Sequence, residues 1–312
     1  MRTIELIYPH TLILEELPKT VAAIGFFDGI HKGHQEVINT AVSKAKESSM
    51  ESAVITFHPH PSVVLKKETE HVQYITPIRE KQEILQQMDV DRLYIINFSK
   101  KLSSLSPQEF IDHFILGLNI KHLVAGFDFS YGHKGKGNMN NINSYTRGKF
   151  DCTTINKVEL DNEKVSSTKI RSLLVKGNVE KVNEYLGRKL SVHGTVVEGD
   201  KRGRTIGFPT ANLEINDDTL LPKIGVYAVK ALYKGEVYEA MANLGVKPTF
   251  QPNETKPKVE VNIFDYSNDL YGEELQIEWC TFIRDEKKFN GVNELVEQIK
   301  SDELEIRRYF SS

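Results

Sequence analysis

Two histidines three residues apart, His31 and His34, end a glycine-containing segment with the sequence Gly25-Phe26-Phe27-Asp28-Gly29-Ile30-His31-Lys32-Gly33-His34. At the start of a helix this spacing places both imidazoles on one face. The helix amino terminus adds free N–H groups and about half a positive charge, and glycines let the backbone approach an anion. The segment therefore predicts a phosphate site at which the imidazoles stabilise charge developing on phosphate oxygens. A surface turn with two unconnected histidines is the alternative.

A second segment suited to phosphate binding spans residues 199–212. Its glycines let backbone N–H groups surround phosphate oxygens, and its basic side chains neutralise phosphate charge. Its Pro-Thr-Ala-Asn end offers hard oxygen ligands, which suit Mg²⁺ bound together with ATP. The predicted contacts are Gly199, Lys201, Gly203, Arg204, Gly207, Thr210 and Asn212, with Thr210 and Asn212 as the metal ligands. A basic β-turn without a ligand is the alternative.

A lone carboxylate, Glu260, interrupts a third segment that is otherwise apolar on alternate positions. Val259, Val261 and Ile263 alternate with it in the period of a strand. A carboxylate inside such a strand is a candidate functional group. An outward-facing glutamate on an exposed strand is the alternative.

The elements around the two histidines alternate between strand-like and helix-like patterns. Short apolar runs predict strands, and apolar spacings of three and four predict helices. The predicted strands cover residues 21–25, 53–57, 92–98 and 121–126, and the predicted helices cover 34–46, 80–88 and 107–116. This alternation predicts a doubly wound, Rossmann-like α/β domain with a parallel sheet and helices on both faces.

The pattern changes near residue 187. Two short helices, 170–176 and 179–186, precede strands at 191–198, 225–233, 236–244, 259–266 and 275–283. Strands at this spacing without intervening helices predict a small antiparallel β-barrel. A carboxy-terminal amphipathic helix follows, with Val292, Leu295, Val296, Ile299 and Ile306 on its apolar face. We expect two domains, residues 1–186 and 187–312.

Composition and charge narrow the class of protein. Lys and Arg total 40 and Asp and Glu total 43, so no net field attracts nucleic acid or an anionic membrane. No apolar stretch approaches the roughly 18 residues of a membrane span. The chain has two cysteines, which fits a reducing compartment. We expect a cytoplasmic enzyme without nucleic-acid or membrane partners, and we leave weak self-association open.

The His31–His34 segment resembles the HxGH signature of the nucleotidyltransferase superfamily, and the longer Gly25–His34 string resembles its FAD synthetase branch. Three further segments resemble that branch: 56–61 (Thr-Phe-His-Pro-His-Pro), 124–132 and 166–171. The resemblance implies that both histidines contact the phosphates at the α-phosphorus that undergoes displacement. The nucleotide contacts it implies are Gly25, Phe26, Asp28, Gly33, Asp128, Ser167, Thr168 and Arg171. Some relatives have Asn at the position of Asp128. A metal site built from His31, His34, His58 and His60 is an alternative, although their spacing is not that of a zinc site.

The second half resembles the riboflavin kinase family. Its Pro-Thr-Ala-Asn segment, the string from Asn243 to Phe250 and the strand 259–264 follow in that family's order. The resemblance implies that Glu260 is the base that activates the ribityl hydroxyl of riboflavin, and that Arg284 belongs to the loop on the flavin side. Many relatives have His at the position of Asn262, which weakens any role for Asn262.

The resemblance spans residues 15–310 and implies a bifunctional enzyme of flavin cofactor biosynthesis. Its substrates would be riboflavin, FMN and ATP. The first step would phosphorylate riboflavin to FMN, and the second would adenylylate FMN to FAD with release of pyrophosphate. Two other classes remain open. One is a nucleotidyltransferase for a pantetheine, nicotinamide or glycerol phosphate, with the barrel as a binding module. The other is a flavin or RNA sensor without catalysis.

Overall fold

The computed structural model describes residues 1–65, 72–199, 202–246 and 257–312, and Lys201 lies outside them. The chain divides into two compact units, Met1–Ser167 and Thr168–Ser312. Helices α7 (Ser167–Val175) and α8 (Val179–Leu186) separate this division from the boundary predicted after residue 186. That boundary stays a prediction.

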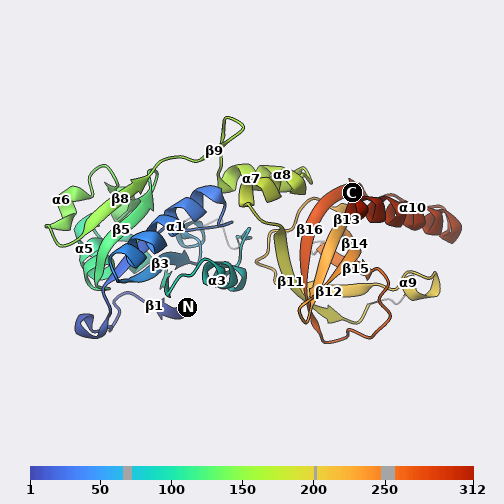
Figure 1. Cartoon of the computed structure of the whole chain (residues 1–312), viewed down its shortest axis with the longest axis horizontal. Coiled ribbons are helices and arrows are strands. Elements are labelled where there is room, and N and C mark those ends of the chain that lie inside the picture. The colour runs from blue at the N-terminus through green and yellow to red at the C-terminus, as the bar shows by residue number, and fades with distance from the viewer. Residues whose placement is uncertain (66–71, 200–201, 247–256) are drawn as a thin grey trace. The chain divides into compact units, whose positions relative to one another are not determined.

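The first unit is built on a parallel sheet of six strands in the order β1-β4-β3-β2-β5-β8 (Figure 1). The strands are β1 (Arg2–Leu6), β2 (Thr20–Ile24), β3 (Glu51–His58), β4 (Arg92–Asn97), β5 (Ile120–Gly126) and β8 (Asp151–Ile155). The helices are α1 (Lys32–Glu47), α2 (Pro61–Leu65), α3 (Ile78–Gln87), α4 (Lys100–Ser103), α5 (Pro107–Ile111) and α6 (Asn143–Thr146), with a π-helical turn (Asp112–Leu116) after α5. Two short ribbons pair β6 (Ser130–Tyr131) with β7 (Gly137–Asn138) and β9 (Glu159–Leu160) with β10 (Glu163–Lys164).

Helices cover both faces of this sheet, as predicted. Strand β2 is buried along its whole length, so alternate residues enter different cores. Ala22 and Ile24 join the core that contains Phe110 of α5. Val21 and Ala23 join the core that contains the apolar stripe of α1.

The strand order brings the ends of β2 and β5 together. After β4 the chain crosses back and places β5 beside β2, with Ile24 paired with Ala125. Ligands of open α/β sheets bind at the carboxyl ends of strands at such a reversal. The segments that begin at Gly25 and at Gly126 leave the sheet at this point, so the fold places two of the predicted motifs at the usual ligand edge.

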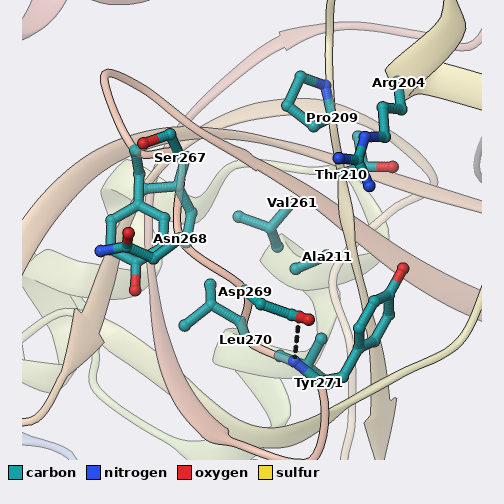
Figure 2. Close-up of a pocket in the computed structure, with 13 residues that line it drawn as sticks. Arg204, Pro209, Thr210, Ala211, Val261, Ser267, Asn268, Asp269, Leu270 and Tyr271 are labelled. Atoms are coloured by element: carbon teal, nitrogen blue, oxygen red, sulfur yellow. Dashed lines mark hydrogen bonds between the residues drawn. The ribbon is translucent and has the colours of Figure 1, made fainter.

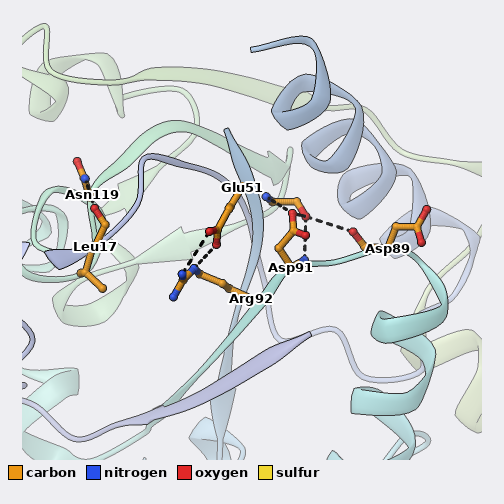
Figure 3. Close-up of polar contacts among 7 residues, drawn as sticks. Leu17, Glu51, Asp89, Asp91, Arg92 and Asn119 are labelled. Carbon is orange, nitrogen blue, oxygen red and sulfur yellow. Dashed lines mark hydrogen bonds and ion pairs between the residues drawn. The ribbon is translucent and has the colours of Figure 1, made fainter. Parts of the chain in front are cut away.

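Polar contacts that join strands lie at the opposite end of the sheet, where β3 and β4 begin (Figure 3). Arg92, the first residue of β4, forms an ion pair with Glu51, the first residue of β3. The Asp91 carboxylate accepts hydrogen bonds of 2.8 Å from both the backbone N–H and the hydroxyl of Ser52. These contacts join neighbouring strands near their amino-terminal ends. The ligand motifs lie at the carboxyl-terminal ends of the strands.

The second unit contains a closed antiparallel barrel in the order β11-β12-β15-β14-β13-β16 (Figure 1). The strands are β11 (Leu190–Val197), β12 (Ala211–Ile215), β13 (Gly225–Tyr233), β14 (Glu236–Val246), β15 (Pro257–Ile263) and β16 (Glu274–Arg284), with α9 (Arg202–Thr205) before β12 and α10 (Val292–Ser311) at the end. Trp279 and Tyr227 are fully buried in its core, with their rings edge to face at 4.9 Å between centroids. The predicted barrel and final helix are therefore confirmed.

Two details differ from the sequence expectation. Val292 is 60% exposed, so this end of the predicted apolar face is open to solvent. It is the first residue of α10, whose buried residues, Asp302 and Ile306, lie further along the helix. Strands β1, β8 and β12 were not predicted. In the edge strand β1 only Leu6 is buried. The strand therefore lacks the apolar–polar alternation from which a strand is predicted.

Candidate functional sites

The two histidines of the first motif form one stacked unit at the start of α1. His31 is the N-cap residue, and its Nδ1 accepts a hydrogen bond of 3.2 Å from the His34 backbone N–H. The two rings stack with centroids 3.6 Å apart and planes 19° apart. A Cβ atom at Gly33 would lie 3.2 Å from Cε1 of His31. A larger residue there would push the His31 ring aside, which explains the glycine between the histidines.

The loop before α1 is held in an unusual shape by buried contacts. Phe27 and Ile30 have φ values of 51° and 39°, a region that non-glycine residues seldom adopt. Both side chains are buried in the core, which anchors the loop on either side of Asp28. The Phe26 carbonyl accepts two hydrogen bonds of 2.9 Å, from the Thr56 hydroxyl and from the Lys81 ammonium. The loop is thus preorganised by groups from β3 and α3.

Asp28 ties this loop to a neighbouring segment. Its Oδ1 accepts hydrogen bonds from the backbone N–H groups of Ile75 at 2.9 Å and Thr76 at 3.2 Å, and the residue is buried. The backbone carbonyl of Asp28 accepts a hydrogen bond of 2.7 Å from the Ser167 hydroxyl. A direct contact between the Asp28 carboxylate and a nucleotide stays a prediction. In the structure, the Asp28 carboxylate anchors the loop to residues 75 and 76.

Burial lowers the pKa of Lys81 from 10.5 to about 8, and the nearby Asp28 carboxylate opposes this shift. The ammonium form is therefore less favourable in the folded than in the unfolded protein. Below about pH 8 this penalty is fully present, and it disappears as the pH rises from about 8 to 10.5. We expect the free energy of unfolding of the wild type, minus that of Lys81→Met, to rise by up to about 3 kcal/mol over this range.

Urea unfolding of both proteins at pH 7 and pH 10 measures this difference, because groups common to both cancel. A difference that stays constant between the two pH values would contradict a lowered pKa at Lys81.

The remaining predicted residues of the first site lie on separate elements. Gly25 and Gly33 flank the loop described above. Asp128, after β5, forms an ion pair of 2.9 Å with Lys164, whose ammonium also lies over the Phe127 ring. Ser167 begins α7 and contacts the loop, while Thr168 and Arg171 lie on α7 in the second unit. Among the described residues, no group of His, Cys, Asp or Glu side chains is arranged to hold a metal ion, so the alternative of a histidine metal site finds no support there.

In the barrel, the strand register brings three polar residues into one row. Glu260 on β15 pairs with Asn212 on β12 and with Asn243 on β14. Directly paired residues of an antiparallel sheet point to the same face. The three side chains therefore share one face, which is the face opposite to the buried Val259 and Val261.

Glu260 lines a pocket of about 370 Å³. Its polar lining includes Thr210, Asn243, Glu260 and Arg284, and its apolar lining includes Phe208, Met241, Phe289, Leu295 and Ile299. Glu260 is half-buried, so the alternative of an exposed glutamate on an open strand does not hold. Gly203 also lines this pocket.

Asn262, two residues from Glu260 on the same face, has a definite contact. Its amide donates a hydrogen bond of 2.6 Å to the Pro209 carbonyl. It therefore fixes the backbone just before Thr210. The sequence gave no reason to assign Asn262 a role. The structure indicates that its side chain positions the backbone of the Pro-Thr-Ala-Asn segment.

A second pocket, of about 360 Å³, lies on the other face of β15 (Figure 2). Val261 and Ile263 line it together with Arg204, Thr210 and a wall formed by residues 266–271. Thr210 lines both pockets. The Pro-Thr-Ala-Asn segment thus borders two cavities, as a group placed between two substrates would. Gly207 follows α9 with a φ of 88° and lines neither pocket.

The side chains of Thr210, which lines both pockets, and of Asn212, two residues later, suit a hard cation held with ATP. The Asn212 side chain lies directly against Gly199, where an added Cβ would sit 2.1 Å from the Asn212 amide nitrogen. A larger residue at position 199 would displace the Asn212 side chain. The Asn212 amide and the Thr210 hydroxyl both carry neutral oxygen donors, which Mg²⁺ accepts. The donor chemistry of Thr210 and Asn212 therefore fits the predicted metal.

Arg284 lines the Glu260 pocket, but its charge is satisfied by the last helix. Its guanidinium forms two-pronged hydrogen bonds of 2.6–2.9 Å to the Asp302 carboxylate on α10. Asp302 is 3% exposed and also accepts a hydrogen bond from Gln298. The pair fastens α10 to the end of β16. Direct contact of Arg284 with flavin stays a prediction.

We expect Asp302→Asn to destabilise the barrel by about 3 kcal/mol, because a buried guanidinium would lose its charge partner. Trp279 is the chain's only tryptophan and lies in the barrel core, so its fluorescence during urea unfolding reports this change. Asp265→Asn is the matched control. Asp265 forms an ion pair with Arg307 of α10, but the Asp265 side chain is 79% exposed. This variant should therefore unfold like the wild type. Equal unfolding curves for all three proteins would contradict a stabilising role for the buried pair.

Sequence reasoning missed Lys81 and Asp302, yet a signal for both is visible in the sequence. Each is a charged residue at an apolar position of an amphipathic helix. Lys81 lies between Ile78 and Leu85 on α3, at spacings of three and four. Asp302 lies between Ile299 and Ile306 on α10 at the same spacings. A charge on the apolar stripe of a helix predicts a buried charge that needs partners.

Comparison with known proteins agrees with this two-part architecture. Residues 13–169 match the family model described as FAD synthetase, and residues 186–310 match the one described as riboflavin kinase. The bifunctional riboflavin kinase/FMN adenylyltransferase of Bacillus subtilis is 48% identical over 100% of this chain and 99% of its own length. The proteins of the same name from Listeria monocytogenes and Escherichia coli K12 are 44% and 32% identical over 99% and 96% of their lengths, and over 100% and 96% of this chain.

A solved structure also matches both parts of the chain. It is described as a macrolide-efflux protein from Streptococcus pneumoniae, with a TM-score of 0.89, 36% identity and coverage of 98% of this chain and 99% of that one. In the described part of the present chain, no helix is both long and apolar enough to cross a membrane. With full-length relatives and a family model for each part, the chain belongs to the bifunctional riboflavin kinase/FMN adenylyltransferase family.

Proposed function

We propose that this chain makes FAD from riboflavin in two ATP-dependent steps, with the kinase step at the Glu260 pocket and the adenylyl transfer at the His31–His34 loop. The observation that carries this proposal is Glu260, which lines a pocket in the barrel together with Asn243 and is paired in register with Asn212. A barrel that served only as a binding module would need no carboxylate at that position. Both activities also follow from the family and its full-length members.

In the kinase step, the pocket that holds Glu260 takes riboflavin. Its apolar walls, including Phe208, Phe289 and Ile299, suit a planar ring system. Glu260 accepts the proton of the terminal ribityl hydroxyl while that oxygen attacks the γ-phosphorus of ATP, and ADP leaves. The pocket on the other face of β15 takes ATP, with Arg204 against its phosphates. Thr210 and Asn212 would hold Mg²⁺, which when bound neutralises phosphate charge.

In the second step, the first unit takes ATP and FMN. An oxygen of the FMN phosphate attacks the α-phosphorus of ATP, and pyrophosphate leaves. His31 and His34 hold the charge that develops on the α-phosphate oxygens, and the N–H groups at the start of α1 add to this. The resemblance of residues 166–171 to the family's phosphate motif assigns Ser167, Thr168 and Arg171 to contacts with the ATP phosphates. A chain of this length with two cysteines is typical of a reducing compartment, so we place both reactions in the cytoplasm.

Labelled ATP tests the whole proposal. Riboflavin is incubated with the chain and with ATP that carries ³²P at either the α or the γ position, and the flavins are separated. We expect γ label in FMN, and α label only in FAD. FMN labelled without FAD, even when FMN is supplied, would reject the second step. A nucleotidyltransferase acting on another phosphate ester would instead transfer α label to that ester and leave riboflavin unchanged.

A further inference from the structure

A buried lysine lies directly behind the loop that carries the two histidines. Lys81 on α3 is 2% exposed. Its ammonium donates hydrogen bonds to the Phe26 carbonyl at 2.9 Å and to the Thr56 hydroxyl at 3.3 Å, and it lies 5.2 Å from the centre of the Phe26 ring. These partners are neutral. Among the described residues, no carboxylate forms an ion pair with Lys81, and Asp28 acts on it from a longer distance.

The fold does not require a charge at this position. The Phe26 carbonyl already accepts a hydrogen bond of 2.9 Å from the Thr56 hydroxyl, so it would remain satisfied without Lys81. An ammonium without an ion-pair partner in the interior is unfavourable. An apolar side chain of the same length at this position of α3 would avoid that penalty. A charge retained against its own stability indicates a functional use.

The surroundings of Lys81 indicate which ligand uses this charge. Phe26 belongs to the loop whose next residues, Phe27 to Ile30, lead to the N-cap His31. The Lys81 ammonium and the amino terminus of α1 therefore both place positive charge at the same loop. An anion bound against this loop would favour the protonated lysine, and the protonated lysine would favour the anion. The triphosphate of ATP has this charge.

We propose that Lys81 is a positioning residue of the adenylyltransferase site, which holds the loop through the Phe26 carbonyl and lends its buried positive charge to the binding of ATP phosphates. This inference rests on the proposed assignment of ATP to the loop 25–34. Lys81 does not touch the reacting atoms. It acts through Phe26, and its contribution to ATP binding is electrostatic.

Lys81→Met removes the charge and keeps the length of the side chain. We expect kcat/KM for ATP in FAD formation from FMN to fall about tenfold or more, mainly through KM, which corresponds to about 1.4 kcal/mol. FMN formation in the barrel should stay unchanged, and thermal unfolding followed by circular dichroism should occur at the same or a higher temperature. Thr56→Val is the matched control. It removes the other donor to the same carbonyl and keeps the charge, so its loss should be clearly smaller.

Three results would overturn the inference. The first is normal FAD formation by Lys81→Met, and the second is an equal loss in Thr56→Val. The third is a fall in unfolding temperature that accompanies the loss of activity, since a structural lysine would behave in this way. His34→Ala, measured alongside, separates this inference from the proposed function. FAD formation retained by His34→Ala rejects the ATP site itself, whereas its loss there with full activity in Lys81→Met rejects only the role of Lys81.

Discussion

Replacement of His34 by alanine should lower FAD formation from FMN by about 10²–10³-fold while riboflavin phosphorylation continues at the wild-type rate. The reason lies in the stacked pair. His34 lies 3.6 Å from His31 between ring centroids, and its backbone N–H donates to the His31 ring. Alanine keeps that backbone contact and removes one of the two imidazoles that we assign to the phosphate. The fall should therefore appear in kcat rather than in the stability of the first unit.

Both activities can be measured in the same protein sample, so the barrel provides an internal control. His122→Ala provides a second control, because His122 lies near the start of β5 and bonds to Thr153 on β8, at the end of the strand away from the loop. It should form FAD normally. If His34→Ala lost both activities equally while remaining folded, the assignment of the two reactions to two separate sites would be wrong.

The positions of the catalytic motifs could be predicted because each follows a strongly patterned element. The apolar run of residues 21–25 and the apolar stripe of α1 confine the histidines to a strand-to-helix junction, which is where the structure has them. The barrel strand around Glu260 alternates clearly enough to fix which residues share a face. In both places a local period decides the geometry, and the period is visible in the sequence.

The support for these motifs could not be predicted, because it depends on pairing between distant segments. Nothing near Phe26 in the sequence indicates that Thr56 and Lys81 meet at its carbonyl, 30 and 55 residues away. The order of the strands decides this, and strand order is set by the packing of the whole sheet. The meeting of Asn212 and Asn243 on either side of Glu260 likewise depends on barrel closure. Strand β12, which carries Asn212, was not predicted, because its motif residues interrupt the alternation.

Glu260→Gln should produce the opposite pattern to His34→Ala. We expect riboflavin phosphorylation to fall by about 10²–10⁴-fold, the usual contribution of a general base, while FAD still forms when FMN is supplied. Glutamine keeps the size of the side chain and an oxygen that accepts hydrogen bonds, but it cannot take up the proton of a hydroxyl. Binding should survive, because the apolar walls of the pocket are unchanged. Riboflavin affinity, followed through quenching of Trp279 fluorescence, should therefore stay near the wild-type value.

Glu239→Gln is the matched control, since Glu239 is an exposed carboxylate on β14 and lines neither pocket. Its kinase activity should equal that of the wild type. The pairing of a kcat loss with intact binding is what distinguishes a base from a residue that merely shapes the pocket, because a change in shape would weaken binding as well. Weak riboflavin binding by Glu260→Gln with a normal kcat at saturation would therefore assign Glu260 to substrate binding and leave the proton acceptor to another group of the same pocket.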